Sequence, residues 1–293
     1  MSTEHARAGG QAAQGHRLPV ANPMTPTRLG ATSAPAHKLP LANAGQALRR
    51  AVPHLCLTVV LLALSLVLWW RAWITGSPAS TMTCKCGDPG LFLWYIASAA
   101  HSIAHLQNPF FSNAIYAHQG GANLLVDTSI IGPASLLSPI TWLFGPVAAF
   151  NVLMLAVPVI NGLSMFALLR RVTRFLPGQI LASVMYAFSP CVIGANLYAH
   201  FHVSILFFPP LAASCLYDLA LAKDPGRRSP KTIGAFLGLL CVLQFFVGSE
   251  LELITVIVLG SSSCVIAMTC ARQLAWSRRQ DLTTAFTVAI AIS

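Results

Sequence analysis

The chain has 293 residues, of which 55% are hydrophobic and only 9% are charged, and its formal net charge is +10. A typical soluble domain carries about a quarter of charged residues, because its surface must meet water. A composition this apolar excludes a soluble globular enzyme, a nucleic-acid-binding domain and a disordered regulator. The sequence therefore predicts an integral membrane protein whose first partner is the lipid bilayer, with no nucleic acid among its partners.

The N-terminal part combines a polar tail with a first apolar run. Residues 1–48 are rich in Ala, Gly, Pro and Thr and show no apolar periodicity, which is typical of a disordered tail. The run over residues 53–74 supplies the roughly 20 apolar residues that a membrane span needs. It follows Arg49 and Arg50 and ends in a cluster of tryptophans, which are typical of a membrane interface. We interpret it as a signal anchor with a cytoplasmic N-terminus.

The next segment, residues 75–143, has mixed character and is predicted to be a long loop on the outer side. Within it, residues 90–106 have a helical pattern, but they are interrupted by two histidines and are short for a span. We predict a helix that lies in or near the membrane interface.

The remaining apolar runs complete a transmembrane domain over residues 49–293. The fold class predicted is an all-α polytopic membrane protein with six full transmembrane helices and a truncated seventh. The predicted spans cover residues 53–74, 145–169, 178–197, 203–222, 232–248, 251–269 and, as the incomplete seventh, 282–293. A half-span leaves backbone carbonyls unpaired in lipid unless protein covers them. We therefore expect either a fragment or a truncated form of a longer ancestor.

The positions of the basic residues support this assignment of membrane spans. When the spans cross the membrane alternately, every Lys and Arg falls on one side except Arg71 and Lys85. Because positively charged loops remain in the cytoplasm, that side is predicted to be cytoplasmic.

Asp88 is one of four acidic residues predicted on the outer side, with Asp127, Glu250 and Glu252. It precedes Pro89, and Asp followed by Pro is a common N-cap and first-turn pair at a helix start. The functional interpretation is a general base near the bilayer surface, beside a lipid-borne substrate. Both interpretations can hold together, since capping uses one carboxylate oxygen.

The predicted chain begins with a cytoplasmic N-terminus and one span, followed by a long outer loop that carries an Asp and an interfacial helix. This arrangement resembles the GT-C superfamily of membrane glycosyltransferases. Several short phrases, in this order over about residues 50–280, are similar to a bacterial multi-spanning branch of that superfamily. They are Gly87-Asp88-Pro89, Asn108-Pro109-Phe110-Phe111, His118-Gln119-Gly120-Gly121-Ala122-Asn123-Leu124, Ser138-Pro139-Ile140 with Gly145-Pro146, Phe188-Ser189-Pro190, His200-Phe201-His202 and Gly248-Ser249-Glu250. Relatives usually have more spans, often eight or more, and many carry a soluble outer domain after them.

The resemblance implies an inverting hexosyl- or pentosyltransferase in the bacterial cell membrane. It would move a sugar from a polyprenyl-phosphate donor to an envelope glycan or lipid acceptor on the outer side. Asp88 would deprotonate the acceptor hydroxyl, as one carboxylate does in inverting glycosidases. The leaving phosphate needs cations or hydrogen-bond donors at the same height. The candidate substrate-binding residues are Arg71, Lys85, His200, His202 and Glu250.

Each of these residues also has a structural interpretation. Arg71 is placed to snorkel beside the tryptophans, and the two histidines to hydrogen-bond at the interface. Glu250 is also expected at the start of a helix, where the helix dipole favours an acid.

No cofactor is predicted. The paired acidic motif that some relatives use for a divalent metal is reduced here to Asp88 alone. His101 and His105 have an i, i+4 spacing that suits a metal ion, with His118 as a third candidate ligand. The simpler interpretation is the polar face of an interfacial helix, and no metal site is predicted.

Two alternatives to an active transferase remain open. Prolines in or near the spans are also typical of transporters, in which broken helices line a site. The alternatives are therefore a carrier without transferase chemistry, or an inactive accessory protein of envelope assembly. Cys84 and Cys86 flank Lys85, and a bond between them would be strained, so free thiols or a bridge to another chain also remain open.

Overall fold

The computed structural model describes residues 40–82, 88–115, 117–125, 130–220, 229–269 and 278–293. The chain divides into two compact units, Met1–Gly45 and Gln46–Ser293. Of the first unit, only the beginning of one helix is described. The following description concerns the second unit.

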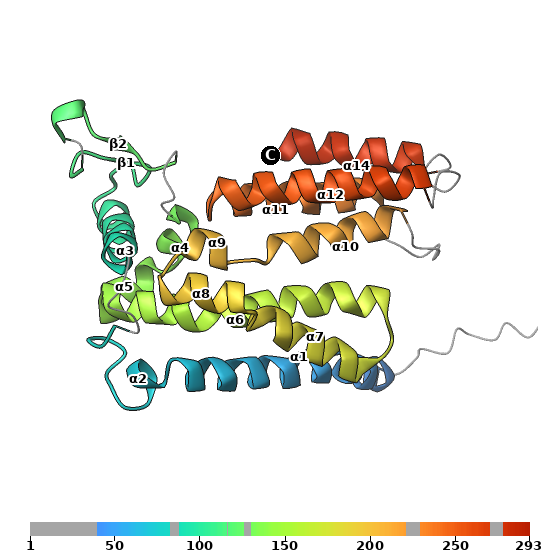
Figure 1. The fold of residues 1–293 in the computed structure, drawn as a ribbon, viewed down its shortest axis with the longest axis horizontal. Coiled ribbons are helices and arrows are strands. Elements are labelled where there is room, and N and C mark those ends of the chain that lie inside the picture. Colours follow the sequence, from blue (N-terminus) through green and yellow to red (C-terminus); the bar gives the residue numbers. More distant parts are fainter. Residues whose placement is uncertain (1–39, 83–87, 116, 126–129, 221–228, 270–277) are drawn as a thin grey trace, which may run out of the picture. The chain divides into compact units, whose positions relative to one another are not determined.

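The second unit is built mainly of helices, long ones together with shorter segments, that run roughly side by side (Figure 1). They are α1 (Pro40–Leu68), α6 (Pro146–Val172), α7 (Leu176–Ala187), α8 (Pro190–Leu197), α9 (Phe201–Ser204), α10 (Phe208–Ala220), α11 (Pro230–Phe245), α12 (Ser249–Thr269) and α14 (Arg279–Ile292).

Four helical segments of the described chain are long and apolar enough to cross a membrane, and they cover Ala51–Leu68, Pro146–Val172, Leu176–Leu197 and Phe201–Ala220. The chain is therefore a multi-pass, predominantly helical membrane protein. The last three predicted spans are occupied by α11, a shorter apolar helix of 16 residues, by α12 with 21 residues and by α14 with 14 residues.

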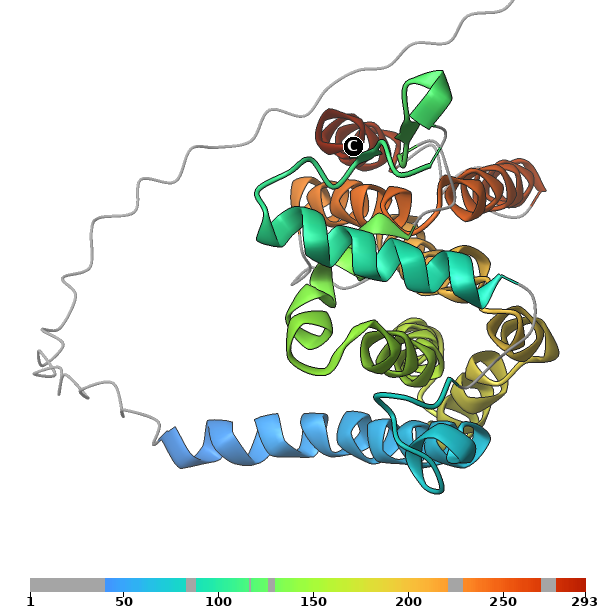
Figure 2. The same ribbon diagram turned by 90° about the vertical axis from the view of Figure 1, so that its left-hand side faces the viewer.

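Smaller elements gather at one end of the long helices. They are α2 (Trp70–Trp73), α3 (Pro89–Ala104), β1 (Phe111–Ser112), the 3-10 turn η1 (Ala117–Gln119), β2 (Ala122–Asn123), α4 (Ile131–Leu136) and α5 (Ser138–Phe144). The two short strands pair antiparallel, with Phe111 opposite Asn123. Helix α3 lies across the ends of the long helices rather than along them, as Figures 1 and 2 show from two directions.

The third and fourth predicted spans are broken within the membrane-length segments. The third is interrupted after α7, where the Ser189 hydroxyl accepts a hydrogen bond from the Val192 N–H and Pro190 opens α8. The fourth consists of the single turn α9, an irregular stretch over residues 205–207, and then α10. Uniform apolar patterning cannot distinguish a broken helix from a continuous one, which is why the sequence predicted continuous spans.

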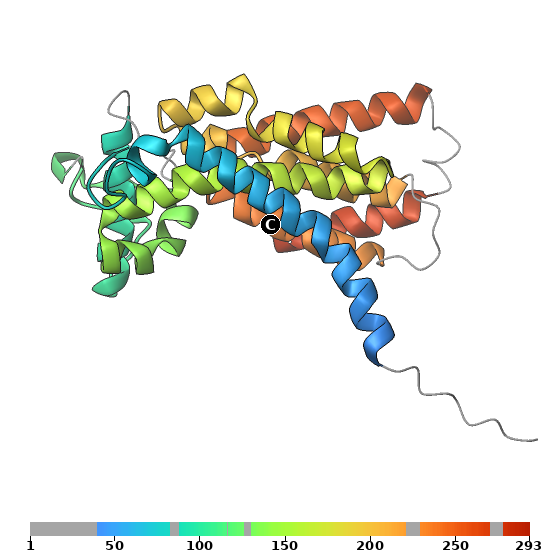
Figure 3. The same cartoon turned by 90° about the horizontal axis from the view of Figure 1, so that it is seen from below.

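Three apolar cores hold the unit together. The largest lies beneath α3, where Phe92 and Tyr95 pack with Phe150 of α6 and Phe201 of α9. A second joins α10, α11 and α14. The third joins α1 to α6 and α7, and Figure 3 shows α1 crossing these two helices obliquely. Packing in the first core holds α3 at its end of the unit.

Basic residues in the described chain gather at the opposite end. Arg170 and Arg171 lie in the last turn of α6, Lys231 at the start of α11, and Arg279 at the start of α14, all at the end of the unit away from α3 (Figure 1). Arg71 in α2 lies at the α3 end.

Candidate functional site

Two predicted site residues, Asp88 and His200, meet at the end of the unit where α3 lies. Asp88 immediately precedes α3, and His200 immediately precedes α9. The His200 Nε2 atom lies 3.2 Å from the Asp88 Oδ2 atom. The Asp88 side chain is 60% exposed and that of His200 is 39% exposed, so the pair faces the surface and is open to a reactant.

Asp88 occupies the N-cap position of α3, with Pro89 in the first turn, as the Asp-Pro pattern indicates. In the described structure, however, its carboxylate makes no capping hydrogen bond to the helix. The N–H groups of Leu91 and Phe92 instead bond to the Asp88 backbone carbonyl. The capping interpretation is therefore correct for the backbone and wrong for the side chain, which is turned to His200.

The backbone around Ala199 directs His200 toward this pair. Ala199 has a φ of +57°, in the left-handed region. Its N–H donates to the carbonyl of Asn196, and the N–H of His200 donates to that of Ala195. These two bonds form a Schellman motif at the end of α8. The motif reverses the chain direction, so that His200 projects from the helix end rather than continuing the helix.

His202 is held between two other elements. Its ring stacks on Phe92 of α3 with centroids 5.7 Å apart and an interplanar angle of 14°. On the α11–α12 turn, a Cβ added at Gly248 would lie 2.9 Å from the His202 Cβ atom. The rings of His202 and His200 have centroids 5.7 Å apart. Three phrases that are remote in the sequence, around Asp88, His200 and Gly248, thus come together here.

The other predicted residues lie apart from this pair or outside the described chain. Glu250 lies exposed in the first turn of α12, two residues after Gly248. Arg71 lies exposed in α2, between Trp70 and Trp73. Lys85, together with Cys84 and Cys86, lies outside the described residues.

The rings of His101 and His105 lie close together, tilted to each other by 33°, at the end of α3. Their ring centroids are 4.1 Å apart, and the Nδ1 atom of His105 lies 2.9 Å from the carbonyl oxygen of His101. Within the described residues, no three His, Cys, Asp or Glu side chains cluster closely enough to hold a metal ion. His118 lies in η1, in the loop between the two strands.

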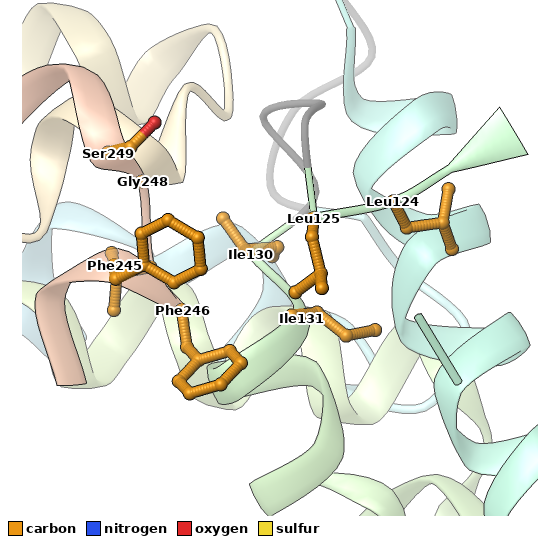
Figure 4. Close-up of a pocket in the computed structure, with 9 residues that line it drawn as sticks. Leu124, Leu125, Ile130, Ile131, Phe245, Phe246, Gly248 and Ser249 are labelled. Carbon is orange, nitrogen blue, oxygen red and sulfur yellow. The ribbon is translucent and has the colours of Figure 1, made fainter. Parts of the chain in front are cut away.

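A small pocket that the sequence did not indicate lies beside Gly248 (Figure 4). Its volume is about 10 Å³, roughly the space that one water molecule needs. Leu124, Leu125, Ile130 and Ile131 line one side, and residues 245–249 line the other. A hydrogen bond joins the two sides, because the Gly132 N–H donates to the Phe246 carbonyl oxygen at 2.9 Å. Apolar loop residues of this kind have no distinguishing pattern in a sequence already rich in such residues.

Asn161 is a second feature that the sequence analysis missed. It is fully buried in α6, and both ends of its amide bond to the backbone of the break between α9 and α10. A polar residue in the middle of a span was a usable signal, because apolar surroundings penalise unpaired polar groups.

No protein-family model, curated protein or solved structure matches this chain in the comparisons made.

Proposed function

We propose that the chain is a membrane glycosyltransferase of the GT-C type that transfers a sugar from a polyprenyl-phosphate donor to a cell-envelope acceptor. The observation that carries the proposal is the Asp88–His200 pair. It offers a solvent-accessible carboxylate, of which one oxygen faces an imidazole, at the end of a membrane-helix unit. A carboxylate at that position can accept a proton from an acceptor that approaches from the aqueous side.

In the proposed reaction, an acceptor hydroxyl gives its proton to the Asp88 carboxylate as its oxygen attacks the anomeric carbon. The new bond forms on the face opposite the leaving group, so the configuration at that carbon inverts. The bond between the anomeric carbon and the phosphate oxygen breaks, and its electron pair remains on the polyprenyl phosphate. His200, which contacts Asp88, and His202, whose ring lies 5.7 Å from that of His200, are proposed as the donors that stabilise that phosphate. Arg71, Lys85 and Glu250 are proposed as further substrate-binding groups.

The charge distribution supports an orientation for this reaction. Most of the described Lys and Arg residues lie at the end of the unit away from α3, with Arg71 as the exception, and such an excess marks the cytoplasmic side of bacterial membranes. We therefore place Asp88 on the outer side and the N-terminus in the cytoplasm. In this arrangement α11, α12 and α14 correspond to the fifth, sixth and seventh predicted spans.

The test is transfer in isolated membranes that contain the full chain. The donors are a panel of polyprenyl-phosphate hexoses and pentoses labelled in the sugar. Asp88→Asn, which preserves shape but removes the basic carboxylate, is expected to abolish transfer without changing the protein level. Asp281→Asn is the matched control, because Asp281 lies in α14 at the opposite end of the unit. Normal transfer by Asp88→Asn removes Asp88 from the mechanism.

A carrier is the second candidate, and the break between α9 and α10 favours it, because transporters use broken helices to line their sites. Deletion of the gene distinguishes the two. Loss of a sugar from the envelope glycan supports the transferase, whereas altered uptake with an intact glycan supports the carrier.

A further inference from the structure

We infer that Asn161 is a positioning residue for the Asp88–His200 pair, although it touches neither of them. The inference rests on the proposed function and deepens it, because it names the residue on which the geometry of the proposed base depends. Asn161 lies in α6 and is fully buried. Its hydrogen-bond partners lie at the C-terminal end of α9, the single turn that follows His200.

Helix α9 cannot hold its own position, because it has only four residues. One helical turn fixes several backbone dihedrals for a single hydrogen bond, so it is unstable without outside support. Its first end is held by the Schellman motif at Ala199. Its other end runs into the irregular residues 205–207. The position of His200 therefore depends on what holds this second end.

The break is encoded locally by Pro209 and Pro210. Neither has an N–H, so in a continuous helix the carbonyls of Ile205 and Leu206 would lack their usual donors. In the structure, the Tyr186 hydroxyl donates to the Leu206 carbonyl oxygen at 2.8 Å. Prolines thus remove the helix bonds, and a tyrosine from the preceding helix replaces one of them.

Asn161 satisfies two further backbone groups at the break. Its Nδ2 donates to the Ser204 carbonyl oxygen at 2.8 Å, and its Oδ1 accepts from the Leu206 N–H at 2.7 Å. In apolar surroundings such backbone groups must be paired within the protein. Without the amide, the chain at residues 204–206 must move until they find other partners.

A short series of contacts carries that movement to the pair. The Ser204 N–H donates to the His200 carbonyl at 3.0 Å, which makes the two residues ends of the same turn. Phe201 in that turn packs edge-on against Phe92 and Phe150, with centroids 5.6 and 5.3 Å apart. Displacement of Ser204 therefore shifts His200 relative to Asp88.

The first measurement compares Asn161→Leu with Gln179→Leu. Gln179 is a matched control, because it is also a buried amide that donates to a backbone carbonyl, that of Thr173 at 2.7 Å, at the end of the unit away from α3. Asn161→Leu is expected to lower kcat by about 100-fold, the size of effect that a misplacement of about 1 Å produces. KM for the labelled donor and all parameters of Gln179→Leu are expected to remain close to the original values.

The second measurement does not depend on transfer. In a full-length chain with its native cysteines replaced by alanine, Asp88→Cys and His200→Cys are introduced together. They are cross-linked in membranes with a short bifunctional methanethiosulfonate. Cross-linking is expected in this background and with Gln179→Leu, and is expected to be lost with Asn161→Leu. Tyr186→Phe, a milder change at the same break, is expected to reduce it and serves if Asn161→Leu does not accumulate.

The outcomes separate the two proposals. If Asn161→Leu and Tyr186→Phe cross-link as well as the parent double-cysteine chain, the positioning role is overturned. Failure of the parent chain to cross-link overturns it as well. A different outcome is that cross-linking follows the expected pattern but the protein transfers no sugar from any donor. That outcome supports the role of Asn161 in the geometry of the pair and counts against the proposed glycosyltransferase activity.

Discussion

Asp88 and His200 are 112 positions apart in the chain, yet their Oδ2 and Nε2 atoms lie 3.2 Å apart. The contact joins α3, which lies across the end of the unit, to the chain reversal between α8 and α9. Since both side chains are substantially exposed, this contact is not needed to fill a core. It is better suited to orienting a carboxylate toward a reactant.

The first prediction concerns His200. His200→Ala is expected to lower transfer by about 100-fold, the lower range for loss of one donor that stabilises charge in the transition state. The thermal unfolding midpoint in detergent is expected to change little, because exposed ion pairs contribute only about 0–1 kcal/mol. The control is His101→Ala, an exposed histidine at the other end of α3. A large loss of stability with His200→Ala would show that the pair is structural.

The second prediction concerns Gly248, where the chain turns past His202. In Gly248→Ala the new Cβ would lie 2.9 Å from the His202 Cβ and 3.0 Å from its carbonyl oxygen, so the turn and α9 must separate. We expect a loss of about 1–3 kcal/mol in unfolding free energy and reduced transfer. Gly260→Ala in α12 is the control, since its Cβ would meet no atom of the described chain within 4 Å. Equal effects of the two substitutions would contradict the packing argument.

The third prediction concerns the contact between α11 and α14. Gly234 and Gly238 of α11 face Ala285 and Ala289 of α14, and a Cβ at Gly238 would lie 2.7 Å from the Ala289 carbonyl oxygen. Small residues at this spacing allow helix backbones to approach closely in membranes. Gly238→Leu is expected to separate the helices and to increase proteolysis of α14 in detergent. Gly194→Leu in α8, where space is open within the described structure, is expected to leave the cleavage pattern unchanged.

The fourth prediction concerns the ion pair between Arg171 of α6 and Asp218 of α10. The Asp218 side chain is only 6% exposed, so removal of the arginine leaves a buried charge without this partner. Arg171→Met is expected to cost about 3–5 kcal/mol of unfolding free energy. The double variant Arg171→Met with Asp218→Leu is expected to regain most of that loss, as measured by thermal unfolding in detergent. Additive losses in the double variant would mean that the two side chains do not act as a pair.

Much of the candidate site was recognisable from residue types, because polar side chains are rare in this chain. Asp88 stands before the predicted interfacial helix, and Glu250 lies in a short phrase that is similar to the GT-C family. His200 and His202 stand at the end of a predicted span, where an imidazole is conspicuous. The pairing of Asp88 with His200 was not predicted, since each was assigned a separate role. Similarly, the helix at Pro89–Ala104 follows from local pattern, whereas its orientation across the other helices depends on the core around Phe92 and Tyr95.

The sequence by itself determined the membrane class, the positions of the long apolar helices and the segregation of basic residues, because composition and span length act locally along the chain. The tertiary structure decided which polar groups compensate the helix breaks and which side chains meet. Pro209 and Pro210 mark a break in the sequence, but the amide of Asn161 and the hydroxyl of Tyr186, which stabilise it, come from other helices. Such partners are set by packing between distant segments, because an unpaired backbone group in apolar surroundings is satisfied by whichever neighbour the fold brings within hydrogen-bond distance.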